Sequence, residues 1–250
     1  MRTTSLLLAL AALLALAAQP AAAAKPRQAR FLAKFEGTVK TDWNVPRHQL
    51  GASCFRTNWG EGSGSETWTV RSTGENRVLA SDNGVATQLQ YGSWRPNADT
   101  RQGGLRAKGE VMRSGVRKTS FTPGTCGLGE SGDDPRPPTD CGTRLVNYEV
   151  GLPYWKGEVV PDVLAAGNGI REKIRFETCP IITPRNVLAG SWPAVEGKLS
   201  RTALYGGRKT LTITGRDAWT GRTRTPGGAP DSTATTSVRW KLVLTRVRGR

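Results

Sequence analysis

Cysteines and acidic residues gather in the segment Thr125–Gly142, which reads TCGLGESGDDPRPPTDCG. Between Cys126 and Cys141 lie four acidic residues: Glu130, Asp133, Asp134 and Asp140. Carboxylates suit Ca²⁺, but this ion needs about six to eight oxygen ligands on a backbone that curls around it. The residue order does not match an EF-hand, and three prolines stiffen the loop. The segment therefore favours a sealed, solvated loop, and we expect no metal or other cofactor.

The remaining cysteine chemistry points to disulfides. Four cysteines are present, no C-x-x-C motif occurs, and one histidine is too few for a Cys/His zinc site. Four cysteines allow about three connectivities. The short loop favours a Cys126–Cys141 bridge, worth about 3 kcal/mol in chain entropy, and Cys54–Cys179 then follows by elimination.

Few histidine-dependent mechanisms are compatible with this sequence, because His48, in VPRHQLG, is the only histidine. A Ser-His-Asp or Cys-His enzyme would have to use it, yet no G-x-S-x-G motif is present. We interpret His48 as a plain surface residue. Paired carboxylates need no histidine, so a glycosidase is compatible with the sequence. Several glutamates lie in or near expected strands, without a spacing that selects a pair: Glu36, Glu149, Glu158, Glu172 and Glu177.

Tryptophans and basic residues supply the other candidate binding groups. Trp68 and Trp240 lie on apolar strand faces and are expected in the core. Other tryptophans sit beside Gly or Pro, where they could stack on sugars or bases or cap the ends of a β-sandwich: Trp59, Trp94, Trp155, Trp192 and Trp219. The densest basic set, a candidate polyanion site, is at the C-terminus: Arg239, Lys241, Arg246, Arg248 and Arg250.

The net charge of +16, from 36 Lys and Arg against 20 Asp and Glu, favours salt-sensitive binding to anionic envelope polymers. The same charge is compatible with a solvated face that keeps the protein soluble. The excess of arginine over lysine, 26 against 10, matches the residue usage of a GC-rich bacterial genome. No nucleic-acid recognition motif is visible, so binding to nucleic acid is expected to be non-specific at most.

The N-terminus predicts a secretory signal peptide. Arg2 precedes the 14-residue apolar run Ser5–Ala18, Pro20 follows, and Ala22-Ala23-Ala24 gives the A-x-A cleavage pattern. The run is shorter than the roughly 20 residues that span a bilayer. We therefore expect residues 1–24 to be removed after Ala24, no membrane span, and a secreted, extracellular protein.

Alternation with a period of two dominates the remaining chain and predicts strands. In Phe31–Trp43, apolar odd positions alternate with charged even positions. The same rhythm recurs in ETWTVRS, VATQLQYG, Arg144–Val150, EKIRFET, TLTIT and VRWKLVLTRVR, where a change of phase at Val247 predicts a bulge. Asn83-Gly84 predicts a hairpin turn.

Breaks between these runs organise the expected fold. GEGSGS (60–65) is interpreted as a flexible loop and residues 220–236 as a long surface loop, while Pro161–Ala166 is the best helix candidate. Many strands and almost no helix predict an all-β fold, an antiparallel β-sandwich or barrel-like structure of about ten strands with long Gly/Pro-rich loops. Residues 25–250 would form one β domain, or two β halves at 31–122 and 143–250.

Together these patterns favour an exported, non-enzymatic protein that binds anionic cell-envelope or extracellular polymers or glycans. The alternative is a histidine-independent carbohydrate-active enzyme or carbohydrate-binding module that uses loop tryptophans and paired carboxylates. Ligand identity, disulfide connectivity and oligomeric state are not determined by the sequence.

Overall fold

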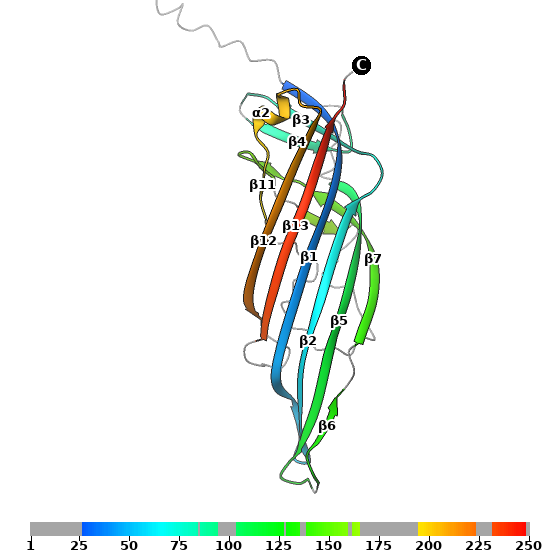
Figure 1. Cartoon of the computed structure of the whole chain (residues 1–250), viewed down its shortest axis with the longest axis vertical. Coiled ribbons are helices and arrows are strands. Elements are labelled where there is room, and N and C mark those ends of the chain that lie inside the picture. The colour runs from blue at the N-terminus through cyan, green and yellow to red at the C-terminus, as the bar shows by residue number, and fades with distance from the viewer. Residues whose placement is uncertain are drawn as a thin grey trace, which may run out of the picture.

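The computed structural model describes residues 27–84, 86–94, 104–127, 129–135, 139–159, 162–165, 195–223 and 232–248. Its main feature is a ten-stranded antiparallel sheet whose longest path runs β10-β7-β5-β2-β1-β13-β12 (Figure 1). In this order the strands are β10 (Asp162–Ala165), β7 (Thr139–Gly151), β5 (Leu105–Pro123), β2 (Arg56–Ser72), β1 (Arg27–Ala52), β13 (Ser232–Arg246) and β12 (Thr210–Thr223). The expected all-β, antiparallel class is confirmed.

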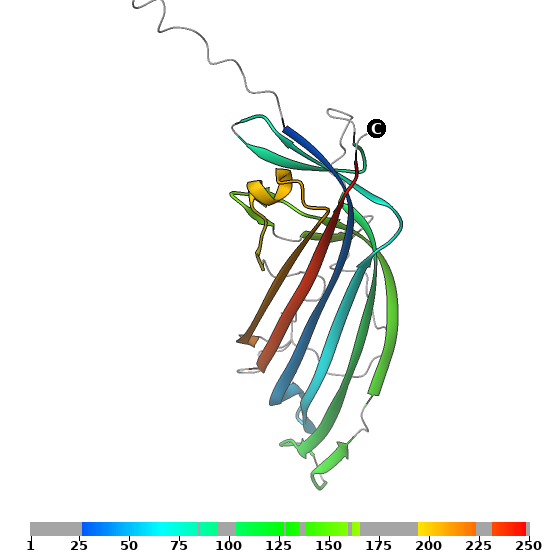
Figure 2. The same ribbon diagram turned by 45° about the horizontal axis from the view of Figure 1, so that its top comes forward.

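Shorter elements lie toward the two ends of this sheet. β3 (Asn76–Asp82) pairs with the beginning of β1 and with β4 (Thr87–Tyr91), close to the short helix α2 (Arg201–Tyr205). β6 (Gly132–Pro135) pairs with β5 at the opposite end. A separate three-stranded sheet consists of β8 (Tyr154–Trp155), β9 (Glu158–Val159) and β11 (Gly197–Lys198). Figure 2 shows the curvature of the large sheet, with β3, β4 and α2 across one end.

Strand alternation divides the large sheet into a buried face and an exposed face, called here the inner face and the outer face. On β1, Phe35 and Val39 are buried, whereas Glu36 and Lys40 are exposed. The register carries this division across the sheet, because Val39 pairs with Trp68 on β2. Burial of each such large apolar side chain stabilises the fold by about 1.5–3 kcal/mol. The alternation predicted from sequence is therefore confirmed for β1 and its neighbours.

The small sheet packs against the inner face beside Trp240. The indole Nε1 of Trp240 donates a hydrogen bond to the carbonyl oxygen of Val195, 2.9 Å away. A Cβ at Gly197 would lie 2.4 Å from Cη2 of the same indole. Glycine is therefore required where β11 crosses Trp240. This contact holds β11 against the inner face of the large sheet at β13.

The glycine-rich segment 60–65, expected to be a flexible loop, lies inside β2. Gly64 pairs directly with Trp43 of β1. A Cβ at Gly64 would lie 2.4 Å from Cζ2 of Trp43 and 2.7 Å from the carbonyl oxygen of Ser114. Glycine in a strand commonly marks such a close approach. The loop prediction was wrong because the glycine serves a contact with a residue distant in sequence.

Three other local expectations are corrected. Residues 162–165, within the expected helix, form β10 and pair with β7, so pairing across the sheet overrides a weak local preference. β12 extends to Thr223 and β13 begins at Ser232, so the strands occupy both ends of the expected surface loop. Val247 follows the end of β13, whose register with β1 is unbroken, so its phase change marks a strand end and no bulge. The segment EKIRFET lies outside the described residues.

The hairpin predicted at Asn83-Gly84 is confirmed, since β3 and β4 pair antiparallel on either side of it. Gly84 has a φ of +93°, which L side chains rarely adopt. The carboxylate of Asp82 accepts a hydrogen bond from the Gly84 N–H at 2.8 Å, and the Asn83 side chain accepts one from the Ala86 N–H at 2.9 Å. The turn is thus held by its own side chains.

His48 is buried within β1, with 5% of its surface exposed, which corrects the expectation of a surface residue. The register between β1 and β2 shifts between Val45 and His48. Such an irregularity re-aims the side chains that follow it. The His48 Nδ1 lies 3.1 Å from the carbonyl oxygen of Pro46, so the ring contacts the backbone of its own strand.

Candidate polyanion-binding surface

Basic side chains from strands far apart in sequence meet on the outer face. Arg239 and Lys241 are two residues apart on β13 and therefore point to the same side of the sheet. Lys241 pairs with Glu36 on β1, and Glu36 pairs in turn with Arg71 on β2. One residue row further along, Thr38 of β1 lies between Arg239 and Thr69 in the register. The order of strands thus assembles one polar and mainly basic cluster.

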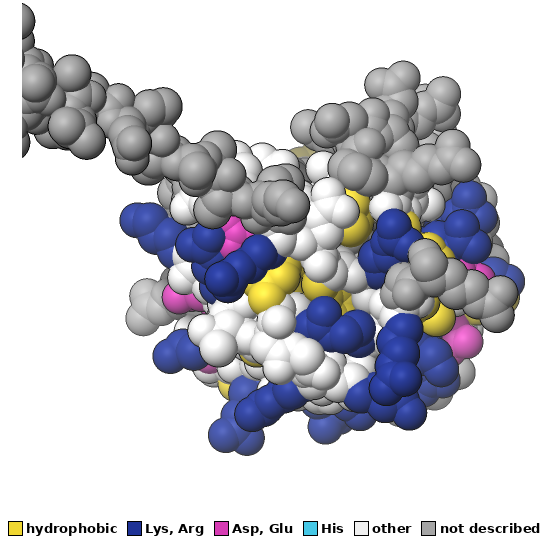
Figure 3. All heavy atoms as spheres, turned by 90° about the horizontal axis from the view of Figure 1, so that it is seen from above, with side chains coloured by type: hydrophobic (Ala, Val, Ile, Leu, Met, Phe, Trp, Pro, Cys, Tyr) yellow, Lys and Arg dark blue, Asp and Glu magenta, His cyan; other side chains and the backbone are white. Residues whose placement is uncertain are grey.

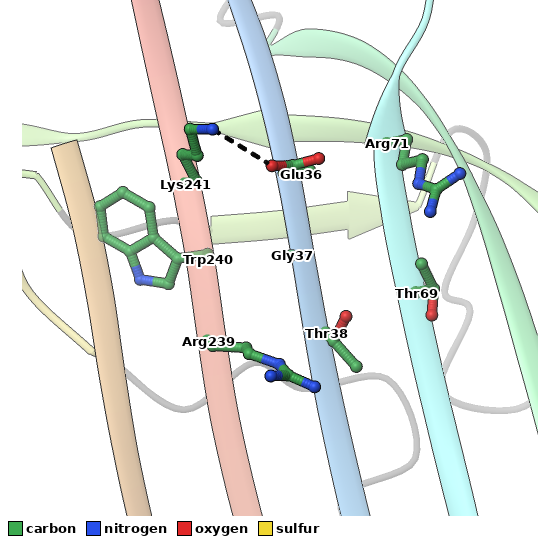
Figure 4. Close-up of a pocket in the computed structure, with 8 residues that line it drawn as sticks. All are labelled: Glu36, Gly37, Thr38, Thr69, Arg71, Arg239, Trp240 and Lys241. Atoms are coloured by element: carbon green, nitrogen blue, oxygen red, sulfur yellow. Dashed lines mark ion pairs between the residues drawn. The ribbon is translucent and has the colours of Figure 1, made fainter. Parts of the chain in front are cut away.

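These residues line a shallow groove with a volume of about 240 Å³: Glu36, Gly37, Thr38, Thr69, Arg71, Arg239, Trp240 and Lys241. Figure 4 shows the Lys241 and Glu36 side chains meeting over β1 and Arg239 extending toward Thr38, while Trp240 turns away. A neighbouring hollow of about 310 Å³ shares Glu36, Arg71 and Lys241. The two hollows together follow β1 and β2 along the outer face, and we call them the outer-face groove.

The electrostatics of the groove are those of an open surface. The Lys241 ammonium lies 3.7 Å from the Glu36 carboxylate, and both side chains are about half exposed, at 48% and 60%. Exposed ion pairs contribute about 0–1 kcal/mol because water screens them. Lys241 can therefore exchange Glu36 for an external anion at little cost. Arg71 and Arg239 offer the planar donor arrays that suit phosphate and carboxylate groups, and the Thr hydroxyls add donors.

The positive charge extends beyond the groove over the outer face. Nine exposed basic residues lie on the outer face of β1, β2, β5, β12 and β13: Lys34, Lys40, Arg71, Arg106, Lys108, Lys118, Arg216, Arg239 and Lys241. Three exposed acidic residues lie among them: Glu36, Asp42 and Glu110. Figure 3, viewed from the end that carries α2, likewise shows Lys and Arg around much of the rim. Such a surface attracts polyanions at long range.

The basic set predicted from sequence is divided by the structure. Arg239 and Lys241 line the groove, whereas Arg246 packs its guanidinium over the Phe31 ring at 5.0 Å and donates hydrogen bonds to the carbonyls of Leu204 and Arg208. Arg246 thus connects β13 to the α2 region. Arg248 is exposed beyond the end of β13, and Arg250 lies outside the described residues.

The sequence did not identify Arg71 as part of the groove, or Lys108 as part of the basic outer face beside it. The register places Arg71 between Glu36 and Lys108. Alternation alone puts Arg71 on the exposed face of its strand, so that signal was present. What was missing is the strand order, because local sequence does not state that β2 lies beside β1 and β1 beside β13.

Two of the candidate stacking tryptophans, Trp59 and Trp94, each have an arginine side chain over the indole ring. The Arg47 guanidinium lies 5.2 Å from the Trp59 ring centre, and the Arg77 guanidinium lies 4.9 Å from that of Trp94. The Trp59 Nε1 donates to the Thr122 hydroxyl at 3.2 Å, and the Trp94 Nε1 donates to the Phe31 carbonyl at 3.1 Å. These two indoles are therefore held by the protein itself.

The other candidate tryptophans are not gathered into one site. Trp219 is half-buried on β12 and packs against the core. The side chain of Trp155 and the whole of Trp192 lie outside the described residues. The described tryptophans thus form no shared stacking platform.

The acidic segment, expected to be a solvated loop, connects β5 to β7, which pair antiparallel. It contains β6 and the first residues of β7, so the loop expectation is corrected for those residues. Asp133 and Asp134 belong to β6, which folds back on β5. No group of three or more His, Cys, Asp or Glu side chains capable of holding a metal occurs in the described part of the chain. Cys54 and Cys126 are exposed thiols. The Cys141 side chain and Cys179 lie outside the described residues, so the expected pairing stays a prediction.

Two buried carboxylates are engaged by arginines. On the inner face, Glu66 is 1% exposed and accepts hydrogen bonds from the Arg113 Nε at 2.7 Å and from the Trp68 Nε1. At the α2 end, Asp82 is 1% exposed and pairs with Arg201, whose proximity lowers the pKa of Asp82. Burial raises the pKa of the nearby Tyr205 to about 12. Both carboxylates hold elements together: Glu66 joins β2 to β5, and Asp82 joins β3 to α2.

No helix in the described ranges is both long and apolar enough to cross a bilayer. Comparisons with protein families, with curated proteins and with solved structures find no match to this chain. The outer-face groove, with Arg71 of β2 converging on Arg239 and Lys241 of β13, is the strongest candidate site that the geometry offers.

Proposed function

We propose that this chain is an exported, non-enzymatic protein that binds anionic polymers of the cell envelope through the outer-face groove. The observation that carries the proposal is the convergence of Arg71, Arg239 and Lys241 on one exposed groove. The excess of basic over acidic side chains on the surrounding face supports it. Export is proposed from the predicted signal peptide at residues 1–24.

The proposed mode of binding follows from the shape of the groove. A shallow, elongated surface with several cations suits a flexible chain of regularly spaced anions better than one small molecule. Each of the two groove arginines, Arg71 and Arg239, would bind two oxygens of one phosphate or carboxylate group, and Lys241 would contribute a mobile point charge. Such contacts release counterions, so affinity should fall steeply with salt.

The finer architecture belongs to the same proposal. We take the large sheet and the sheet β11-β9-β8 as the two layers of a β-sandwich, supported by the packing of Gly197 and Val195 against Trp240. The inner face then stabilises the fold, and the outer face remains available to a ligand.

The test is a titration of the mature protein against poly(glycerol phosphate), dextran and duplex DNA, each at low and high salt. Binding to both polyanions that weakens with salt is expected. In the triple variant Arg71→Ala, Arg239→Ala, Lys241→Ala, the slope of log affinity against log salt should fall by about three, since each lost phosphate contact removes about one.

The matched control removes the same charge elsewhere, through Lys198→Ala, Arg208→Ala and Lys209→Ala, which are exposed near α2. Equal losses in both triple variants would show that net charge alone attracts the polymer and would reject the groove. Salt-insensitive binding to dextran with a change in tryptophan fluorescence would favour the carbohydrate-active alternative instead.

A further inference from the structure

Two exposed turns, each carrying a cysteine, lie side by side at the end of the sheet opposite α2. Cys54 lies in the turn between β1 and β2, and Cys126 lies in the turn that follows β5. The register of β2 with β5 brings them together, because Arg56 at the start of β2 pairs with Pro123 at the end of β5. The meeting of the two cysteines is therefore set by the sheet.

The backbones of the two cysteines are joined directly. The N–H of Cys126 donates a hydrogen bond to the carbonyl oxygen of Cys54 at 2.6 Å, and the N–H of Gly124 donates one to the carbonyl oxygen of Phe55 at 2.9 Å. Chains joined in this way lie about 4.7–5.5 Å apart. A disulfide requires Cα atoms about 4.4–6.8 Å apart, so this spacing suits one.

The turns are built for this close approach. A Cβ at Gly124 would lie 2.3 Å from the carbonyl oxygen of Cys54, and a Cβ at Gly127 would lie 2.1 Å from that of Phe55. The Ser53 hydroxyl accepts hydrogen bonds from the N–H groups of Phe55 and Arg56, both at 3.3 Å. Glycines on one turn and a serine brace on the other thus fix the two cysteines opposite each other.

The thiols themselves interact. A hydrogen bond with the Cys126 thiol raises the pKa of Cys54, so the two sulfur atoms share one small region of the surface. Both side chains are exposed. An oxidant in solution can therefore reach them.

The other predicted partner of Cys126 lies at a different level of the sheet. Cys141 of β7 falls at the register shift opposite Arg113 of β5, between the pairs formed by Met112 and Ser114. β5 ends at Pro123, ten residues beyond Arg113, and Cys126 lies in the turn after Pro123. At about 3.3 Å per residue, the two cysteines are separated by roughly 30 Å of strand. The backbone therefore favours Cys54 over Cys141 as the partner of Cys126.

We propose that Cys54 and Cys126 form a disulfide that locks the β1–β2 turn to the turn after β5. The oxidant is a disulfide, either that of a thiol-disulfide oxidoreductase or oxidised glutathione. One cysteine thiolate attacks it, forming a mixed disulfide and releasing one reduced thiol. The second cysteine attacks the mixed disulfide, forming the Cys54–Cys126 bond and releasing the second reduced thiol. The protein loses two electrons and two protons, and the oxidant gains them.

Peptide mapping tests the proposal on the mature full chain, oxidised with glutathione disulfide and alkylated before digestion. Trypsin with a glutamate-specific protease separates peptides 48–56, 119–130 and 131–144, which carry Cys54, Cys126 and Cys141 in turn. A cross-link between 48–56 and 119–130 that is lost on reduction is expected. A link between 119–130 and 131–144, or full alkylation of both Cys54 and Cys126, would overturn the proposal.

Thermal unfolding gives a second readout. Closing so long a loop should make the oxidised protein melt about 10 °C above the reduced protein. Cys54→Ser, Cys126→Ser and the double variant should each lose the same increment, because all three remove one bond. Cys141→Ser is the control and should retain the 48–56 to 119–130 cross-link. Additive losses in the double variant would show two separate roles and contradict the proposal. The glutathione oxidant makes the test independent of export and of polymer binding.

Discussion

Two ion pairs in this sheet have the same cross-strand geometry and opposite surroundings. Glu66 of β2 is directly opposite Arg113 of β5, and Glu36 of β1 is directly opposite Lys241 of β13. The first pair is on the inner face, where Glu66 is 1% exposed; the second is on the outer face, where Glu36 is 60% exposed. The register brings each pair together, and burial is the main difference between their surroundings.

This difference distinguishes a charge that the fold requires from a charge that an external ligand could reach. Removing one member of a buried pair leaves an uncompensated charge in a medium that cannot solvate it. Removing one member of an exposed pair leaves a group that water solvates at once. The inner-face pair therefore belongs to the fold, and the outer-face pair is free to exchange partners with an anionic ligand.

The largest test of this contrast compares Arg113→Ala with Lys241→Ala. We expect Arg113→Ala to lower the free energy of unfolding by about 3–5 kcal/mol, because it leaves the Glu66 carboxylate buried without its arginine. Lys241→Ala should cost less than about 1 kcal/mol. Urea unfolding followed by tryptophan fluorescence measures both. Similar losses in the two variants would show that burial does not separate the two pairs.

A second test concerns packing on the same inner face. Gly64→Ala places a methyl group against the Trp43 ring and the Ser114 carbonyl. We expect a loss of about 1–3 kcal/mol in the free energy of unfolding, as for other overpacked sites. Gly51→Ala, where a Cβ meets nothing within 4 Å, is the matched control and should be near neutral. Equal free energies of unfolding for the two variants would show that the contact between Gly64 and Trp43 leaves room for a methyl group.

A third test uses pH on the buried carboxylate at the α2 end. Arg201 lowers the pKa of Asp82, so the folded state holds this group ionised below its ordinary pKa of about 3.9. The stability from this pair is complete above that value and is lost as pH falls through the lower folded pKa. Asp82→Asn should therefore unfold with a shallower dependence on pH in the range below the ordinary aspartate pKa. An unchanged dependence would assign the acid sensitivity to other carboxylates.

The smallest expected effect is on the outer face. Glu36→Gln removes a negative charge from the middle of the groove, so binding to poly(glycerol phosphate) at low salt should tighten about two- to fivefold, with little change in stability. Asp42→Asn, six residues along β1 and paired with Lys40, is the control. It lies about two screening lengths away at 0.1 M salt and should change affinity little. Equal tightening by both variants would argue for diffuse attraction over the whole face.

Alternation was sufficient to predict the strands whose two faces differ most. Phe35 and Glu36 on β1, or Trp240 and Lys241 on β13, are neighbours with opposite exposure, and the sequence shows this directly. Gly64 could not be read in the same way, because its reason for being glycine is the Trp43 indole on another strand. The glycines of residues 60–65 suggested a flexible loop, whereas Gly64 allows a close contact with a residue on another strand.

The candidate site was half accessible from sequence for the same reason. Arg239 and Lys241 stand out because they are close in the chain, whereas Arg71 joins them only through the strand order. Arg246 belongs to the same C-terminal run, yet it turns toward Phe31 and the α2 region. Clustering in sequence is thus a weak guide to clustering on a sheet, where neighbours are set by register.

The position of β1 has a consequence for how the chain reaches this structure. β1 forms its longest pairings with β2 and with β13, the last strand among the described residues. Its pairing with β13 runs from Phe31 with Arg246 to Asn44 with Thr233. Pairings this distant in sequence form slowly because a long loop must close first. Until β13 is available, one edge of β1 lacks its partner and β12 has nothing to join. The sheet therefore stays incomplete until β13 has joined β1 and β12, and a chain still emerging from the ribosome carries an unpaired strand edge up to that point.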